Sequence, residues 1–218
     1  MRRFLDRRDA GKQLALKLQE YAERPDVMVL ALPRGGVPVA YEVARALHVP
    51  LDVLIVRKLG LPGQEELAIG AIASGGVRIL NEDIIDALGI NQTVIDHVAE
   101  RELLELQRRE QQYRGDRPSP ETRDKIVILI DDGLATGASM LAAVRAVRVR
   151  QPYRIVVAIP TASTQAIWIL RGEVDEIVYV MSPEPFDGVG KWYENFSQTT
   201  DQEVELLLEE ADHPFDNK

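Results

Sequence analysis

The residues best suited to chemistry lie together in one stretch, Ile128–Ser139, which reads ILIDDGLATGAS. Two adjacent carboxylates, Asp131 and Asp132, follow an apolar run, and a loop of small residues with the hydroxyls of Thr136 and Ser139 comes next. Two carboxylates can hydrogen-bond a pair of sugar hydroxyls or hold a hydrated divalent cation. Small residues expose backbone N–H groups, and a helix that starts there favours negative charge. The stretch therefore predicts sites for sugar hydroxyls and for a phosphate a few residues apart, as on ribose 5-phosphate.

The same stretch also has an ordinary explanation. An aspartate pair followed by a glycine occurs at strand-to-helix turns in which an acid caps the helix. Helix N-termini bind many anions, so the loop alone identifies no single ligand.

A second candidate segment is LPRGG, residues 32–36. It follows an apolar run and combines the charge of Arg34 with the backbone N–H groups of Gly35 and Gly36, which suits an anion. The alternative is a tight turn without a ligand.

A third candidate is the pair Arg57 and Lys58, which we expect at the end of the next strand. The glycine-rich segment 59–67 follows, and we expect it to be a mobile loop. The pair could equally be two solvated charges that flank a strand.

Apolar runs of strand length alternate with helical patterns through most of the chain. This alternation predicts an α/β fold with an open, mostly parallel sheet flanked by helices, in which ligands bind at the carboxyl ends of the strands. If the strand geometry persists, Asp131 and Asp132 point to opposite sides, and at least one faces that crevice. The expected strands are 26–33, 51–58, 125–132, 154–160 and 176–182, the expected helices are 37–48, 139–149 and 163–171, and 68–73 and 77–80 should form a hairpin.

Residues 1–182 are expected to form one α/β core with a helical insertion at about 90–120, and residues 183–218 a small hood and a last helix. The insertion has apolar residues on one side and dense charge on the other, as in a helix that packs one stripe against the body. Three rings of the hood, Phe186, Trp192 and Tyr193, could stack on a planar base or could simply pin the C-terminal segment to the body.

The composition narrows the class of function. The 218 residues carry a net charge of −9, which disfavours non-specific binding to nucleic acid or to an anionic membrane. There is no cysteine, so disulfides, thiolate nucleophiles and cysteine-ligated zinc are excluded. The basic N-terminus is not followed by an apolar stretch long enough for a signal peptide or a membrane span, so we expect a cytoplasmic protein that acts on a small molecule.

These motifs together resemble the type I phosphoribosyltransferases. ILIDDGLATGAS is similar to the family's signature for phosphoribosyl pyrophosphate, PRGG to its pyrophosphate loop, and RKLGLPG to the start of its mobile loop. With the VGKWYENFSQTTD tail, the chain looks most like a bacterial group known only as predicted phosphoribosyltransferases, over nearly its whole length. The resemblance does not name the acceptor.

The resemblance implies a role for each candidate. Asp131 and Asp132 would contact the ribose hydroxyls and, mainly through the donor and water, Mg²⁺ as the cofactor. Arg34, Gly35 and Gly36 would bind pyrophosphate, Arg57 and Lys58 would act at the reacting centre, and the acceptor would meet Phe186, Trp192 and Tyr193. The 5-phosphate loop would be Ala135, Thr136, Gly137, Ala138 and Ser139.

The resemblance also implies the reaction. Ribose 5-phosphate would pass from phosphoribosyl pyrophosphate to a nitrogenous, purine-like base, with release of pyrophosphate, and the protein would be a homodimer. Some purine enzymes of the family have an aspartate where this chain has Ala135, so the general acid or base stays unassigned. Family members often have a cis peptide in the pyrophosphate loop.

Two alternatives stay open. The first is a protein of the same fold that senses phosphoribosyl pyrophosphate without catalysis and regulates a partner. The second is a phosphatase or nucleotide-cofactor enzyme, which is disfavoured because the sequence contains no GxGxxG after the first strand and no GxxxxGK[ST].

Overall fold

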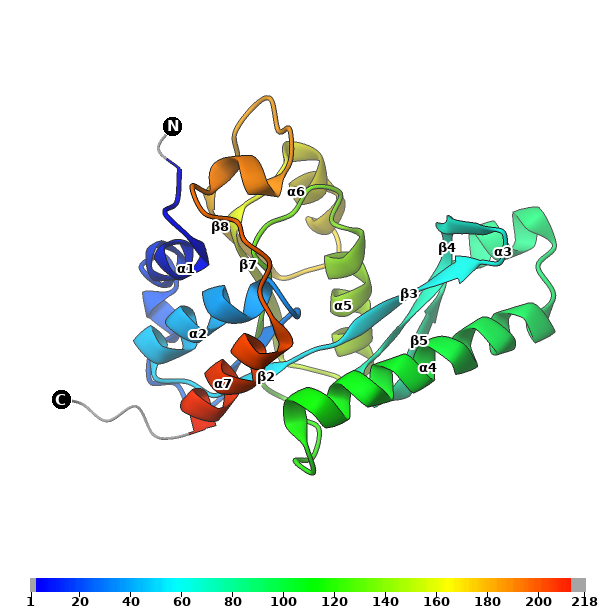
Figure 1. Ribbon diagram of the computed structural model, residues 1–218, viewed down its shortest axis with the longest axis horizontal. Coiled ribbons are helices and arrows are strands. Elements are labelled where there is room, and N and C mark those ends of the chain that lie inside the picture. The colour runs from blue at the N-terminus through cyan, green and yellow to red at the C-terminus, as the bar shows by residue number, and fades with distance from the viewer. Residues whose placement is uncertain (1–2, 213–218) are drawn as a thin grey trace.

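The body of the protein is a five-stranded parallel sheet in the order β2-β1-β6-β7-β8 (Figure 1). The computed structural model describes residues 3–212. The strands are β1 (Val27–Ala31), β2 (Leu51–Val53), β6 (Ile126–Ile130), β7 (Arg154–Thr161) and β8 (Glu176–Met181). The expected α/β fold with a mostly parallel sheet is confirmed.

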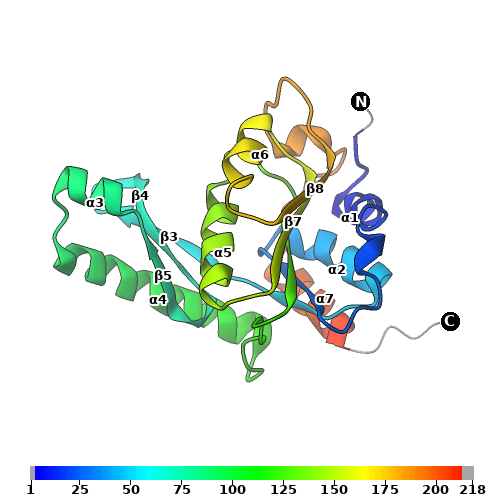
Figure 2. The ribbon, with the colours of Figure 1, turned by 180° about the vertical axis from the view of Figure 1, so that it is seen from behind.

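Helices cover both faces of this sheet (Figures 1 and 2). On β6, Ile126, Ile128 and Ile130 pack on one face, and Val127 and Leu129 pack on the other, so the strand is apolar at every position. One face is covered by α1 (Arg7–Ala15), α2 (Gly36–Leu47) and α7 (Asp201–Asp212), and the other by α5 (Ala138–Val149) and α6 (Thr164–Leu170).

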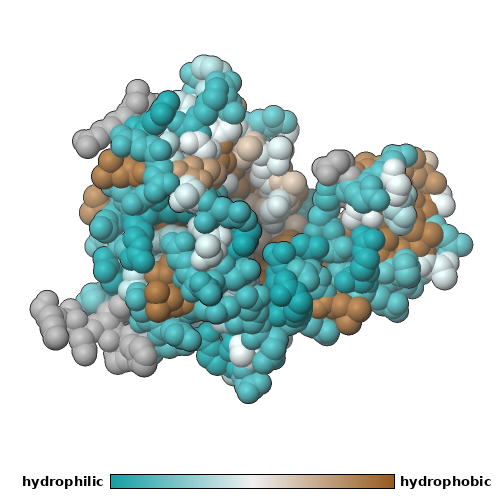
Figure 3. Space-filling model, in the orientation of Figure 1, coloured by the Kyte–Doolittle hydropathy of each residue, from teal (hydrophilic) through white to brown (hydrophobic). Residues whose placement is uncertain are grey.

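A second, antiparallel sheet forms an arm that projects from the body (Figures 1 and 3). Its elements are β3 (Val56–Leu61), β4 (Gln64–Ala73), β5 (Val77–Leu80), α3 (Glu82–Leu88) and α4 (Gln92–Arg114). The expected hairpin and the amphipathic insertion helix are both present: Ile95 and Val98 of α4 are buried in the same apolar cluster as Ile69 and Ile72 of β4.

Two expectations for residues 51–67 are wrong. The core strand ends at Val53, and β3 begins a separate sheet, so Arg57 and Lys58 lie inside an arm strand and do not end a core strand. The segment 59–67 is not an irregular loop, because most of it belongs to β3 and β4. Gly60 and Gly63 permit this pairing: a Cβ on Gly60 would lie 2.5 Å from the carbonyl oxygen of the facing strand, and Gly63 turns the chain with φ +80°.

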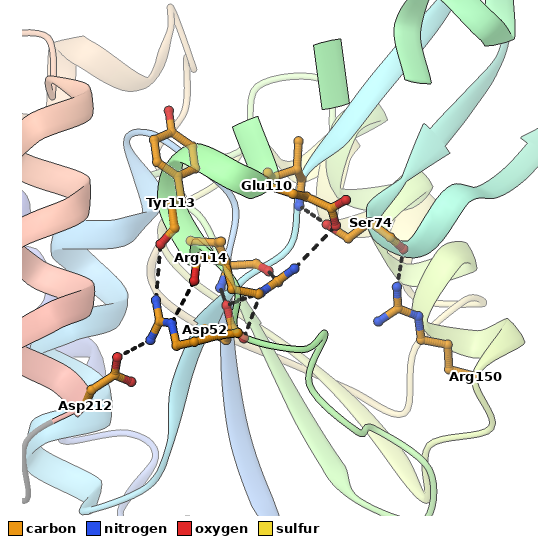
Figure 4. Close-up of polar contacts among 10 residues, drawn as sticks. Asp52, Ser74, Glu110, Tyr113, Arg114, Arg150 and Asp212 are labelled. Atoms are coloured by element: carbon orange, nitrogen blue, oxygen red, sulfur yellow. Dashed lines mark hydrogen bonds and ion pairs between the residues drawn. The ribbon is translucent and has the colours of Figure 1, made fainter. Parts of the chain in front are cut away.

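The arm is fastened to the body by buried polar contacts (Figure 4). The Arg114 side chain, at the end of α4, is 3% exposed and pairs with Asp52 of β2 at 3.2 Å. On the other side, Arg150 donates to the backbone oxygen of Ser74 at the turn between β4 and β5. Breaking such a buried ion pair typically costs about 3 to 5 kcal/mol, so these contacts oppose detachment of the arm.

The hood, residues 183–200, lies against the N-terminal segment. Phe4 pairs with Tyr193 in an isolated bridge, next to a short 3₁₀-helix, η3 (Val189–Trp192). The Thr200 hydroxyl accepts a hydrogen bond from the first turn of α7 at 3.1 Å and caps that helix. Residues 213–218 of the expected C-terminal unit lie outside the described residues. No helix within residues 3–212 is both long and apolar enough to cross a membrane.

Candidate functional site

The alternation of side chains between the two faces of the sheet continues past the end of β6 and separates the two adjacent carboxylates. Val127 and Leu129 face the α5 side of the sheet, and Asp131 follows them; Asp132 turns to the α1 and α2 side. The prediction that the two acids point to opposite sides is therefore confirmed.

Asp131 lines a small cavity of about 120 Å³. Its Oδ1 accepts a hydrogen bond from the backbone N–H of Asp132 at 2.8 Å. Burial, together with the charge of Asp132, raises the pKa of the Asp131 carboxyl well above its usual range. A ligand that brings hydrogen-bond donors or a cation to such a buried carboxyl group stabilises its ionised form. The other lining residues are Leu32, Pro33, Leu54, Ile55, Val56, Arg109 and Ser139.

Asp132 is held from the opposite side by Arg7, a residue that the sequence did not suggest. Arg7 Nε donates to Asp132 Oδ2 at 2.8 Å, and the two side chains are only 11% and 15% exposed. The same guanidinium donates to the Ser197 backbone oxygen at 2.7 Å and lies 4.0 Å above the ring of Phe196. Burial raises the pKa of Asp132, and Arg7 opposes that rise.

The glycines of the PRGG segment are required by the closeness of the acids. A Cβ on Gly35 would lie 2.7 Å from Asp132 Cγ and closer still to Oδ2, and a Cβ on Gly36 would lie 2.7 Å from the backbone oxygen of Ile130. Gly35 caps α2, so the start of this helix is pressed against the end of β6. The expected cis peptide is present, between Pro33 and Arg34.

Arg34 itself points toward the beginning of α7. Its Nη1 is 3.8 Å from Asp201 Oδ2, and the hydroxyl of Tyr113 donates to the other oxygen of Asp201. Burial and the Asp201 carboxylate raise the pKa of Tyr113 to about 12. Arg34 therefore lies at the meeting point of the PRGG segment, α4 and α7.

The small-residue loop has the geometry of an anion site. Gly137 has φ +77° and is followed directly by α5. Ser163 fixes the other end of the loop by donating to the backbone oxygen of Ala135 at 2.6 Å. Thr136 and the first residues of α5, Ala138 and Ser139, are exposed, and the Ala138 N–H donates to the Thr136 hydroxyl at 3.5 Å. The N-terminus of α5, which favours an anion, therefore lies at an exposed loop.

The structure does not bring Arg57 to the cavity. Its Nε and Nη2 donate to Glu102 Oε2 at 2.9 and 2.6 Å, which ties β3 to α4. Val56 lines the cavity, and Lys58 shares its face of the strand because side chains alternate.

The hood rings have different environments. Tyr193 is 3% exposed, packs between Phe4 and Phe196 at centroid distances of 5.4 and 5.0 Å, and donates its hydroxyl to the Asp132 backbone oxygen at 2.5 Å. This ring pins the hood to the end of β6. Phe186 and Trp192 are only half-buried.

The residues fit a Mg²⁺ ion that arrives with a phosphorylated ligand. Within residues 3–212, no three His, Cys, Asp or Glu side chains gather to form a metal site. Mg²⁺ commonly binds through one or two carboxylates, with substrate oxygens and water completing its shell. Asp131 supplies such a carboxylate in the cavity, whereas the Oδ2 of Asp132 is already paired with Arg7.

Comparison with known proteins gives the family. The chain matches the phosphoribosyl transferase domain over residues 5–182. A protein of Mycobacterium tuberculosis, named only provisionally as a phosphoribosyl transferase, is 44% identical over 215 residues, which are 99% of this chain and 48% of that protein. The chain therefore spans about half the length of the curated relatives it matches. A crystal structure of a protein from Thermus thermophilus is 42% identical, has a TM-score of 0.86, and is matched over 96% of this chain and 99% of that one. The chain belongs to the phosphoribosyl transferase family.

Proposed function

We propose that the protein transfers ribose 5-phosphate from phosphoribosyl pyrophosphate to a nitrogenous base and releases pyrophosphate. The observation that carries this proposal is the convergence of three segments on one cavity. Asp131 comes from the end of β6, Ser139 from the start of α5, and Pro33 from the segment that begins α2. A ribose with phosphate groups at both ends needs these three kinds of contact next to one another.

The positions of α2 and α5 suggest how phosphoribosyl pyrophosphate is oriented in the site. α5 and α2 begin on opposite faces of the sheet, and Asp131 lies at the end of the strand between them. Each helix N-terminus favours an anion. We therefore place the 5-phosphate on residues 135–139, the ribose hydroxyls on Asp131, and the pyrophosphate on residues 34–36.

In this arrangement the chain mainly orients the donor and stabilises charge. Asp131 accepts a hydrogen bond from a ribose hydroxyl, while the N–H groups of α5 hold the 5-phosphate. As the bond from the anomeric carbon to pyrophosphate breaks, the N–H group of Gly35 and the charge of Arg34 stabilise the leaving group, whereas the Gly36 N–H already donates to the Leu32 backbone oxygen at 3.1 Å. A nitrogen of the base then takes its place on that carbon. Mg²⁺, held through Asp131 and the donor's oxygens, would neutralise charge on the phosphates.

We place the acceptor against the hood. Val189 lies close to Gly133, where a Cβ would come within 2.5 Å of the valine side chain, so the hood borders the phosphate loop. Phe186 and Trp192 are the half-buried rings nearby in sequence and could cover a flat, purine-like base. The Tyr193 ring is buried, so Tyr193 would support these two rings without contacting the base itself.

One observation keeps the sensor as a second candidate. Arg57, a candidate for contact with the reacting centre, is held by Glu102 on α4. A protein that only binds the donor would not need this cation at the reacting centre.

The test is pyrophosphate release from phosphoribosyl pyrophosphate and Mg²⁺ across a panel of purines, pyrimidines and related heterocycles. We expect release with at least one base, and loss of donor binding in D131N. Tight donor binding without release for any base would favour the sensor. Absence of donor binding by the wild-type protein would refute both functions.

A further inference from the structure

The inner side of α4 carries an arginine at a position where a core residue would be expected. Glu102, Leu106, Arg109 and Tyr113 follow one another at intervals of four, three and four residues, so they form one stripe of the helix. Leu106 and Tyr113 are buried, and Glu102 is 8% exposed and bonded to β3. Arg109 therefore belongs to the inward-facing side of α4, where an unpaired charge would be costly.

Arg109 reaches the same cavity as Asp131. It lines the cavity together with Pro33 of the PRGG segment and Ser139 of α5, and among the described residues that line it, Arg109 is the only cation. Its side chain is 32% exposed, and its Nε donates to Glu105 Oε1 at 2.8 Å. A guanidinium has five N–H donors, so this bond fixes the side chain while other donors can serve a ligand.

The position of Arg109 relative to Arg34 suggests which part of a ligand it meets. Tyr113 and Asp201 form a hydrogen-bonded pair, and Arg34 lies 3.8 Å from that Asp201. Both Arg34 and Arg109 are near enough to Tyr113 to lower its pKa and oppose the rise caused by burial. Both arginines therefore lie near the Tyr113–Asp201 pair, to which Arg34 of the PRGG segment is joined and from which Arg109 is one helical turn away along α4.

The helix that carries Arg109 is held in place at two points. Glu102 binds Arg57 of β3, and Arg114 pairs with Asp52 of the body (Figure 4). Arg109 lies between these two anchors, so its guanidinium is positioned without a loop having to close. A cation fixed in advance loses little conformational entropy when it binds an anion.

We propose that Arg109 is a second pyrophosphate-binding arginine, supplied by the insertion helix, which holds the pyrophosphate group of the donor together with Arg34. The inference rests on the proposed function, because it needs a donor that carries pyrophosphate in this cavity.

The test compares Arg109 with its neighbour Arg108. Arg108 binds the same Glu105, through Nε at 2.8 Å, but it is 59% exposed and does not line the cavity. R109M and R108M each remove one partner of Glu105 and one positive charge, and R109K keeps the charge without the planar fork. Binding of pyrophosphate with Mg²⁺, of phosphoribosyl pyrophosphate with Mg²⁺, and of ribose 5-phosphate is measured by calorimetry for all of them, after circular dichroism has shown that each is folded.

We expect R109M to weaken binding of both pyrophosphate ligands by about 10- to 100-fold, the effect of losing one or two charge-assisted hydrogen bonds. R109K should lose less, and R108M should stay within about twofold of wild type, as a solvated charge does. Ribose 5-phosphate should bind all variants equally, because it lacks the pyrophosphate. If R109M does not fold, the same comparison is made with R109Q.

Three results would overturn the inference in distinguishable ways. If wild type binds pyrophosphate and R109M binds it equally well, Arg109 is not a ligand, although the proposed function stands. If R109M loses ribose 5-phosphate as strongly as pyrophosphate, Arg109 shapes the whole cavity and has no pyrophosphate role. If wild type binds none of the three ligands, the proposed function fails and the inference fails with it.

Discussion

Substitution of Gly35 by alanine tests the contact between the PRGG segment and the acids without any assumption about a ligand. Gly35 has φ −60° and ψ −31°, which alanine adopts without strain. The substitution therefore acts only through space. The new Cβ would lie 2.7 Å from Asp132 Cγ and 3.3 Å from Arg7 Nε, so the carboxylate must move out of its ion pair.

The size of the effect follows from two opposing contributions. Overpacking a well-packed site costs about 1 to 3 kcal/mol. Replacement of glycine by alanine at a compatible backbone position contributes about 0.4 to 1 kcal/mol of stability, because the unfolded chain loses freedom. We expect G35A to lower the free energy of unfolding by a net amount of about 1 to 2 kcal/mol, which for a protein of this size lowers Tm by about 2 to 8 °C.

Removal of Asp132 should reverse the sign of this effect. In a D132A background the two nearest atoms, both of the Asp132 carboxylate, are gone and the next is Arg7 Nε at 3.3 Å, so the substitution should become neutral or stabilising by up to about 1 kcal/mol. G172A is the matched control, because a Cβ on Gly172 would have no neighbour within 4 Å among residues 3–212. Urea denaturation of the four cycle members and the control gives the free energies. An equal effect of G35A in both backgrounds would refute the contact between Gly35 and Asp132.

Two more predictions concern the buried charges. D131N should raise the free energy of unfolding by about 0.5 to 2 kcal/mol at pH 8 and by less at pH 5, measured by urea denaturation. Burial raises the pKa of Asp131, so the wild-type protein loses stability as the pH rises from the ordinary carboxyl range through this raised pKa. An equal gain in stability at pH 5 and pH 8 would contradict this explanation. R114M leaves Asp52 without its buried partner, so amides of β3 to β5 should exchange hydrogen faster relative to those of β6, and unchanged exchange in the arm would contradict the anchoring role.

The sequence predicted the parts of the fold and site that depend on local patterns. The core strands are continuous apolar runs because helices cover both of their faces. The two loops that we assign to phosphoribosyl pyrophosphate can be recognised because each needs a glycine or an acid at a fixed position after a strand. The hairpin 68–80 is predicted by the SerGlyGly turn between two short strand-like runs, and the helix 91–114 by its residue periodicity. Each of these features is decided by residues close together in the chain.

The features that the sequence missed depend on distant contacts. Arg7 and Asp132 are 125 positions apart, and nothing in the RRFLDRRD segment distinguishes Arg7 from its neighbours. The apolar run 51–58 predicts one strand, because this pattern contains no sign that β2 ends at Val53 and that β3 starts a second sheet at Val56. Among these features only Arg109 has a sign in the sequence, because it is a charge within an otherwise inward-facing stripe of the helix. The direction in which that stripe faces is known only once α4 is placed on the arm.

The arginines around the proposed donor site share one arrangement, in which a carboxylate already holds each of them. This pairing fixes the direction of a long side chain and, in a protein with net charge −9, keeps it from pairing elsewhere. A phosphate can still bind, because a carboxylate uses only some of the five guanidinium donors. The donor must therefore add to, or compete with, existing ion pairs, and its binding should weaken less steeply with salt than binding to free cations would. The pairs at the proposed donor site are Arg34 with Asp201 and Arg109 with Glu105, and Arg57, which does not line the cavity, pairs with Glu102 in the arm.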